Sequence, residues 1–111
     1  MDELCEVTIT APDADWLASF VRELVELRLC ASGNVTSALR SIYRWRGDVY
    51  DRAEALATLH TRRDRLDAIA RLANERHPYE IPRLVAVPFI GGSRDYFDWI
   101  DAESSDKPHK P

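Results

Sequence analysis

The stretch LRSIYRWRGDVY, residues 39–50, decides the fold of this chain. Ile42, Tyr43 and Trp45 favour the pleated surface of a β-strand. Gly47-Asp48 next to Arg46 is a turn signal, because glycine adopts positive φ without strain. Val49 and Tyr50 then begin a return strand. The stretch therefore predicts a β-hairpin with strands at 39–45 and 49–60.

The later part of the return strand is ambiguous. Four residues also fit the apolar stripe of a helix, in which alanine is favoured: Ala53, Leu56, Ala57 and His60. The local pattern alone leaves strand and helix open between Asp51 and His60.

On the N-terminal side, residues 3–10 alternate between polar and apolar side chains, which predicts a strand with one apolar face. Pro12-Asp13 breaks that strand, and Asp13 can cap a helix. An amphipathic helix follows, with its apolar stripe at Leu17, Phe20, Val21, Leu24 and Val25. Residues 30–36 contain Gly33 and Asn34 and predict an irregular or bulged strand.

On the C-terminal side, a second helix is predicted, which ends at His77-Pro78 because the residue before proline avoids the helical region. Its apolar stripe consists of Leu66, Ile69, Ala70 and Ala73. A short strand at 84–88 and an aromatic helix around residues 96–100 follow. The stretch 104–111 contains two prolines and little that is apolar, which indicates a disordered tail.

These elements follow the order β-α-β-β-α-β with a final helix. The order predicts an α+β, ferredoxin-like sandwich with an extended hairpin and a short C-terminal helix. A length of 111 residues fits one domain, which we place at residues 1–103.

Composition narrows the class of protein. The net charge of −4 disfavours nucleic acid as a partner. The acidic start, Met1-Asp2-Glu3, lacks the pattern of a secretory signal, and no apolar run approaches the length of a membrane span. The two cysteines, Cys5 and Cys30, are expected to be reduced thiols in a cytoplasmic protein. We predict no disulfide between them, because the third strand of such a sheet separates their positions.

The hairpin is too long for a lone small domain. A strand of up to about 12 residues is about 40 Å long, whereas a domain of this size has a radius of gyration of about 13 Å. The arm should project past the core and leave Tyr43, Trp45 and Tyr50 half exposed. Exposed strands that carry aromatic residues favour pairing with another chain, so the sequence predicts an oligomer.

Three strings of sequence resemble signatures of the CutA family, the divalent-cation tolerance proteins: SIYRWRG (41–47), HPYEIP (77–82) and DYFDWI (95–100). The resemblance covers residues 7–101. It implies a homotrimer whose hairpins pair across subunits, a role in divalent-cation tolerance with copper binding, and no enzymatic reaction. It also favours strand over helix between Asp51 and His60.

Two departures from the family pattern bear on metal binding. The usual family cysteine falls at Ser32, and Cys30, two positions earlier, would point to the same face of a strand. A hydroxyl is a much poorer ligand than a thiolate for Cu(I). His60 stands where the family commonly has lysine, and histidine can bind metal near neutral pH.

The residues expected to bind a divalent metal ion, copper or zinc, are His77, Glu80, His60 and Cys30. Histidine and carboxylate without thiolate suit zinc or Cu(II) better than Cu(I). For His77 the alternative is a role in capping the preceding helix, and for Glu80 it is a structural ion pair. The residues expected at an intersubunit cleft or interface are Tyr43, Trp45, Arg62, Tyr79 and Trp99.

Two other classes of function are compatible with the predicted fold. One is a trimeric sensor similar to the PII-type signalling proteins, which would bind a small anionic ligand in a cleft near His60, Arg62, Tyr79 and Glu80. The other is an acylphosphatase-like enzyme. It is disfavoured because the link 10–13, Thr-Ala-Pro-Asp, carries an acidic residue and neither glycine nor arginine for a phosphate cradle.

Overall fold

The computed structural model of the protein describes residues 3–105. The chain forms strands and helices in the predicted order: β1 (Leu4–Ala11), α1 (Ala14–Glu26), β2 (Ser32–Trp45), β3 (Asp48–Arg62), α2 (Leu66–Arg76), β4 (Leu84–Pro88) and α3 (Arg94–Glu103). A single 3₁₀ turn, Arg63–Arg65, leads into α2.

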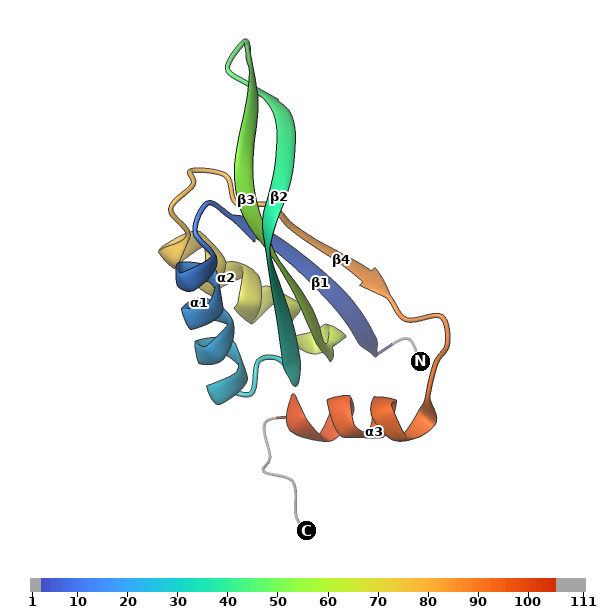
Figure 1. Ribbon diagram of the computed structural model, residues 1–111. Helices are drawn as coiled ribbons and strands as arrows, with labels where there is room; N and C mark the ends of the chain where they lie inside the picture. Colours follow the sequence, from blue (N-terminus) through green and yellow to red (C-terminus); the bar gives the residue numbers. More distant parts are fainter. Residues whose placement is uncertain (1–2, 106–111) are drawn as a thin grey trace.

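The four strands form one antiparallel sheet in the order β2-β3-β1-β4. Helices α1 and α2 lie against the same face of this sheet, while α3 lies across the end of the strands (Figure 1). The opposite face, which we call the open face, carries no helix. The arrangement confirms the predicted ferredoxin-like fold. Strand β3 separates β1 from β2, and Cys5 and Cys30 are both free thiols.

The core lies between the sheet and the two helices. Asp13 caps α1 by accepting hydrogen bonds from the amides of Asp15 and Trp16, as predicted. Four of the five residues of the predicted α1 stripe are buried: Leu17, Phe20, Val21 and Leu24. Gly33 allows β2 to approach this helix, because a Cβ there would lie 2.4 Å from a methyl carbon of Val21. The core is therefore formed by residues three or four positions apart on α1 and by every second residue of β1.

The hairpin turns at Arg46 and Gly47, where φ is 49° and 89°. Two successive residues at positive φ form the type of turn that matches the twist of a hairpin. Lower in the hairpin, β2 contains one extra residue between Thr36 and Leu39, and Ala38 has a φ of 67°. This bulge changes which side chains of β2 face which side of the sheet.

The stretch from Asp51 to His60 is strand throughout, so the helical alternative is excluded. Its lower part pairs with both β1 and β2, whereas its upper part pairs with β2 alone. The upper part therefore projects beyond the rest of the sheet as an arm (Figure 1). The arm accounts for the elongated shape of the chain, which measures 50 × 26 × 23 Å.

Helix α3 is attached to the end of the sheet through Phe97 and Ile100, which pack with Leu4 and Ala31. Ser104, the first residue of the predicted tail, is fully buried, and its hydroxyl donates a hydrogen bond to the carbonyl of Ile100. The carbonyl of Ser105 accepts a hydrogen bond from Arg28. The rest of the predicted tail lies outside the described residues. No helix within residues 3–105 is long and apolar enough to cross a membrane.

Candidate functional site

A row of polar residues crosses the open face near α3. His60 on β3 is paired in register with Ser32 on β2 and with Glu6 on β1. Because paired residues of neighbouring strands point to the same face, the three side chains form one row. Ser32, the position of the expected family cysteine, is thus a cross-strand neighbour of His60.

Both ring nitrogens of His60 are engaged. Nε2 lies 2.9 Å from a carboxylate oxygen of Glu6, and Nδ1 lies 2.6 Å from the hydroxyl of Tyr96 on α3. A carboxylate can only accept, so Nε2 carries the proton and the Tyr96 hydroxyl donates to Nδ1 when the ring is neutral. The side chain of His60 is 21% exposed. A metal ion could bind both groups by replacing the Nε2 proton between the imidazole and the Glu6 carboxylate.

His77, another predicted metal ligand, is used differently. It is the C-terminal capping residue of α2, where its backbone amide donates to the carbonyl of Ala73. Its Nε2 lies 2.6 Å from the carbonyl oxygen of Thr10, and its Nδ1 accepts a hydrogen bond from the amide of Tyr79 at 3.0 Å. The ring is buried, with an edge contact to Trp16. His77 thereby fastens the segment after α2 to the end of β1.

Cys30 lies in the core rather than beside Ser32 on the open face. It precedes β2, which begins at Ser32, so strand alternation does not apply between the two positions, and the expectation of a shared face is wrong. Its side chain is 1% exposed, and burial raises the pKa of the thiol to about 12. Cys30 is therefore a neutral thiol, out of reach of a metal ion, at physiological pH.

A second set of functional candidates surrounds the base of the arm. The hydroxyl of Tyr79 donates a hydrogen bond to Glu54 on β3 at 2.7 Å. Burial, followed by this hydrogen bond and the charge of Glu54, raises the pKa of Tyr79. Glu80 forms an exposed ion pair with Arg46 at the hairpin turn, 2.6 Å apart. Both contacts connect the segment after α2 to the arm.

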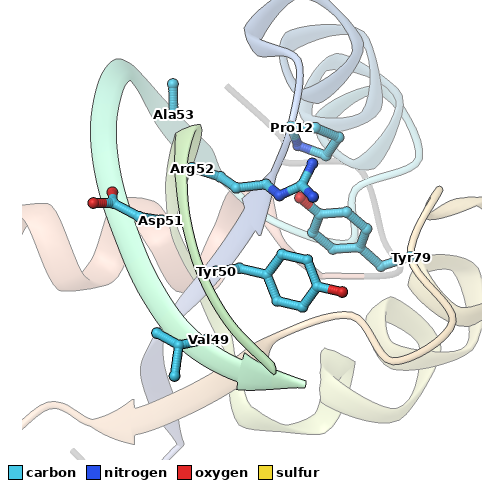
Figure 2. A pocket seen from close by; sticks show the side chains of 7 residues that line it. All are labelled: Pro12, Val49, Tyr50, Asp51, Arg52, Ala53 and Tyr79. Atoms are coloured by element: carbon cyan, nitrogen blue, oxygen red, sulfur yellow. The ribbon is translucent and has the colours of Figure 1, made fainter. Parts of the chain in front are cut away.

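The bulge in β2 turns Tyr43 to the open side, where it meets Tyr50 of β3. Above the bulge, Tyr43 pairs with Tyr50, and their rings stack at 5.5 Å. The guanidinium of Arg52 lies over the Tyr50 ring at 4.8 Å. Figure 2 shows Arg52 and Tyr50 on the same side of β3 as Tyr79, while Asp51 points away from them.

Arg62 and Trp99 lie at the opposite end of the sheet from the arm, near α3. Arg62 forms ion pairs with Asp64 and Asp101, each at 2.8 Å. The hydrogen bond to Arg62 holds the pKa of Asp64 below its usual range. Within one chain the predicted intersubunit residues thus fall into two groups. Tyr43, Trp45 and Tyr79 belong to the arm and its base, whereas Arg62 and Trp99 belong to the end occupied by α3.

The four residues predicted to line an anion cleft are also separated into these two groups. His60 and Arg62 bond to residues of β1, α3 and the start of the 3₁₀ turn, whereas Tyr79 and Glu80 bond to the arm. A single chain does not bring the four residues together. Sequence reasoning did not single out Glu6 and Glu54. Glu6 falls at a polar position in the predicted alternation of residues 3–10, whereas Glu54 lies in the stretch for which the local pattern left strand and helix open.

Comparison with known proteins fits this architecture. The family model described as "CutA1 divalent ion tolerance protein" matches residues 5–103. The chain belongs to this family. The resemblance carried by the three sequence strings is thereby confirmed.

Two relatives illustrate the CutA1 family match. The divalent-cation tolerance protein CutA of Thermus thermophilus is 36% identical over 94 residues, covering 85% of this chain and 91% of the relative. The chloroplastic protein CutA of Arabidopsis thaliana is 30% identical over 94 residues, covering 85% of this chain and 52% of that relative.

Solved structures of CutA1 proteins share the fold. The T. thermophilus divalent cation tolerance protein superposes with a TM-score of 0.88 at 33% identity, covering 92% of this chain and 99% of the other. CutA1 from Oryza sativa gives a TM-score of 0.90 at 27% identity, covering 95% and 96%. The chain thus shares its overall fold with these CutA1 structures.

Proposed function

We propose that this protein is a cytoplasmic, non-enzymatic homotrimer that takes part in divalent-cation tolerance and binds copper or zinc ions weakly at sites shared between subunits. The observation that carries the proposal is the His60–Glu6 pair on the open face of the sheet. Imidazole and carboxylate are ligands for zinc and Cu(II).

The proposed metal site requires ligands from more than one subunit. Residues 3–105 of a single chain contain no group of three or more His, Cys, Asp or Glu side chains placed to hold a metal ion. His60 and Glu6 supply two ligands, and further ligands would come from a second subunit facing the open side. Of the other expected ligands, Glu80 is exposed in its ion pair, whereas His77 and Cys30 are buried.

Exposed apolar residues support the assembly. Ile42 and Val49 on the arm are 66% and 63% exposed, and Val85 and Val87 on β4 are about half exposed. Ile90, two residues after β4, is fully exposed. Strands β2 and β4 are also the two edges of the sheet. Packing and edge pairing with neighbouring copies would remove these surfaces from water. That the assembly contains three subunits is inferred from the family resemblance.

A binding role is favoured over a catalytic one by the partners of the titratable residues. Glu80 is paired with Arg46, and Tyr79 donates its hydroxyl to Glu54. Two buried free thiols favour a reducing compartment such as the cytoplasm.

Static light scattering tests the assembly. We expect a mass about three times that of the 12.7 kDa chain. A mass equal to one chain would overturn the proposal of shared sites.

Calorimetric titration with Cu(II) and Zn(II) tests the metal role. We expect weak, saturable binding by the wild-type protein and its loss in a His60→Gln variant, which keeps a polar side chain but removes the imidazole. Glu75→Gln, on the exposed surface of α2, is the matched control and should bind as the wild type does. Equal metal binding by His60→Gln and the wild type would place the site elsewhere.

A further inference from the structure

A cleft opens between the arm and the segment that joins α2 to β4. It has a volume of about 840 Å³, and both sides contribute to its lining: Tyr43, Tyr50 and Arg52 from the arm, and Tyr79, Ile81 and Arg83 from the joining segment. A second hollow of about 590 Å³ shares Tyr50, Arg52 and Tyr79 (Figure 2). The volume of the larger cleft falls within the range of small-molecule sites.

Local structure holds the walls of this cleft in place. His77 fixes the start of the joining segment to Thr10, and the Tyr79–Glu54 hydrogen bond fixes the segment to β3. Glu54 is 6% exposed, so this hydrogen bond is shielded from water. The far wall is held by the stacked rings of Tyr43 and Tyr50. The cleft is therefore formed by one chain before any ligand arrives.

The cations that line the cleft differ in how they are paired. Arg40 holds Asp51 through hydrogen bonds of 2.8–3.2 Å, so its charge is compensated. Arg52 contacts the face of Tyr50, and no carboxylate of the described residues lies within ion-pair distance of it or of Arg83. Among the lining acids, Glu80 is paired with Arg46, and Glu54 accepts from Tyr79. Two guanidinium groups are thus available to an anion.

The contact between Arg52 and Tyr50 has a chemical consequence. A guanidinium that lies over an aromatic ring keeps its N–H groups free in its own plane. Those groups can form paired hydrogen bonds to a phosphate or carboxylate. The same wall offers aromatic faces to a planar group.

We propose that this cleft binds a small organic anion that carries a planar ring, with its anionic group on Arg52 and Arg83 and its ring against Tyr43, Tyr50 and Tyr79. The inference goes beyond the proposed metal role and does not depend on it, because none of these residues belongs to the His60–Glu6 pair.

Calorimetric titration of the full-length protein with three matched probes tests the proposal. Adenosine 5′-monophosphate supplies ring and anion, adenosine supplies the ring alone, and inorganic phosphate supplies the anion alone. We expect the monophosphate to bind at least tenfold more tightly than either of the other two. An aromatic dicarboxylate, phthalate, is titrated in parallel to distinguish a carboxylate from a phosphate as the preferred anion.

Variants locate the site. Arg52→Gln and Arg83→Gln should each weaken binding of the preferred probe by about tenfold or more, since each removes a charge-assisted contact. Arg71→Gln, on the exposed surface of α2, removes the same charge outside the cleft and should leave binding unchanged. Light scattering and circular dichroism of the same samples establish that each variant keeps the wild-type mass and fold. Should Arg52→Gln fail that check, Arg83→Gln decides the question alone.

Several outcomes would overturn the inference. One is the absence of binding by both the monophosphate and phthalate at millimolar concentration. Others are equal binding of phosphate and the monophosphate, unchanged affinity in both cleft variants, or an equal loss in Arg71→Gln. Zinc titration of the cleft variants separates this test from the metal proposal, because loss of the anion site should leave metal binding at its wild-type level.

Discussion

Ser32 and His60 are directly paired across β2 and β3, on the face of the sheet that no helix covers. His60 also bonds to Glu6, so the row already presents an imidazole and a carboxylate. The family pattern has a cysteine at position 32. A thiol at this position would add a third ligand to the row. Ser32→Cys should therefore raise the affinity for zinc by about tenfold or more, since thiolate is a strong zinc ligand.

Asn34→Cys is the matched control for this change. Asn34 lies on the same strand and face but pairs with Thr58, so it belongs to the neighbouring cross-strand row and not to that of His60. Competition titration with a zinc indicator under reducing conditions measures both variants. Equal gains in affinity at positions 32 and 34 would show that any surface thiol suffices, and would contradict a site built around His60.

Trp45 lies near the tip of the arm, beside the turn, where a neighbouring subunit would meet it. Trp45→Ala should weaken the trimer by about 2 kcal/mol or more, the cost typical of a central aromatic residue at an interface. Sedimentation at decreasing protein concentration measures dissociation. Arg44→Ala, an exposed neighbour on the same strand, should dissociate as the wild type does. An unchanged dissociation curve for Trp45→Ala would remove this residue from the interface.

Local signals in the sequence predict most elements of the fold. The short strand Leu84–Pro88 has the predicted bounds, and Asp13 caps α1 as expected. Residues 51–60 were ambiguous because their alanines and leucines satisfy both periods. These residues form a strand because they pair with β1, which lies more than 40 positions earlier in the chain. A local sequence pattern contains no information about such distant pairing.

The candidate sites were less predictable than the fold because they depend on register and on contacts between distant segments. Alternation placed Glu6 among the polar residues of its strand, but the local pattern around His60 left strand and helix open. Only the alignment of β1 with β3 makes the two residues neighbours. Tyr79 and Glu54 meet because His77 redirects the chain after α2. The bulge at Ala38, which turns Tyr43 to the open face, leaves no distinctive residue type in the sequence.

The buried thiol of Cys30 predicts a loss of stability in alkali. Burial raises its pKa from the ordinary value of 9.0 to about 12 in the folded chain. Below pH 9 the thiol is neutral whether the chain is folded or unfolded, so its contribution is fully present. Between pH 9 and about 12 only the unfolded chain ionises, and stability is lost as the pH rises.

Raising the pKa of the thiol from 9.0 to about 12 corresponds to a loss of roughly 4 kcal/mol of stability once the thiol is fully ionised in the unfolded chain. Urea unfolding of the wild type and of Cys30→Ala between pH 8 and 11 isolates the thiol, because other ionising groups are common to both proteins. The difference in unfolding free energy between the two should shrink as the pH rises. A constant difference would indicate that the thiol titrates alike in both states.

Arg28 combines an unfavourable backbone conformation with favourable side-chain contacts. Its φ is 61°, at the position after the end of α1 where glycine is usual. Its amide bonds to the carbonyl of Val25, and the next amide bonds to the carbonyl of Leu24, which completes a Schellman motif. The chain therefore accepts strain of about 1 kcal/mol to place an arginine there.

Contacts of the Arg28 side chain offset this backbone strain. Its guanidinium donates to the carbonyls of Ala102 and Ser105, at 2.7 and 2.9 Å, where α3 ends. A cation at the C-terminus of a helix is also favoured by the helix dipole. Arg28 thus ties the end of α1 to the end of α3.

Two substitutions at this position separate strain from attachment. Arg28→Ala loses the hydrogen bonds and keeps the strain, so it should cost about 2–4 kcal/mol. Arg28→Gly loses the same bonds but relieves the strain, so it should be about 1 kcal/mol more stable than Arg28→Ala. Amide hydrogen exchange should accelerate across α3 in both variants, while α1 stays protected. Unaltered exchange in α3 would mean that the packing of Phe97 and Ile100 alone holds this helix to the sheet.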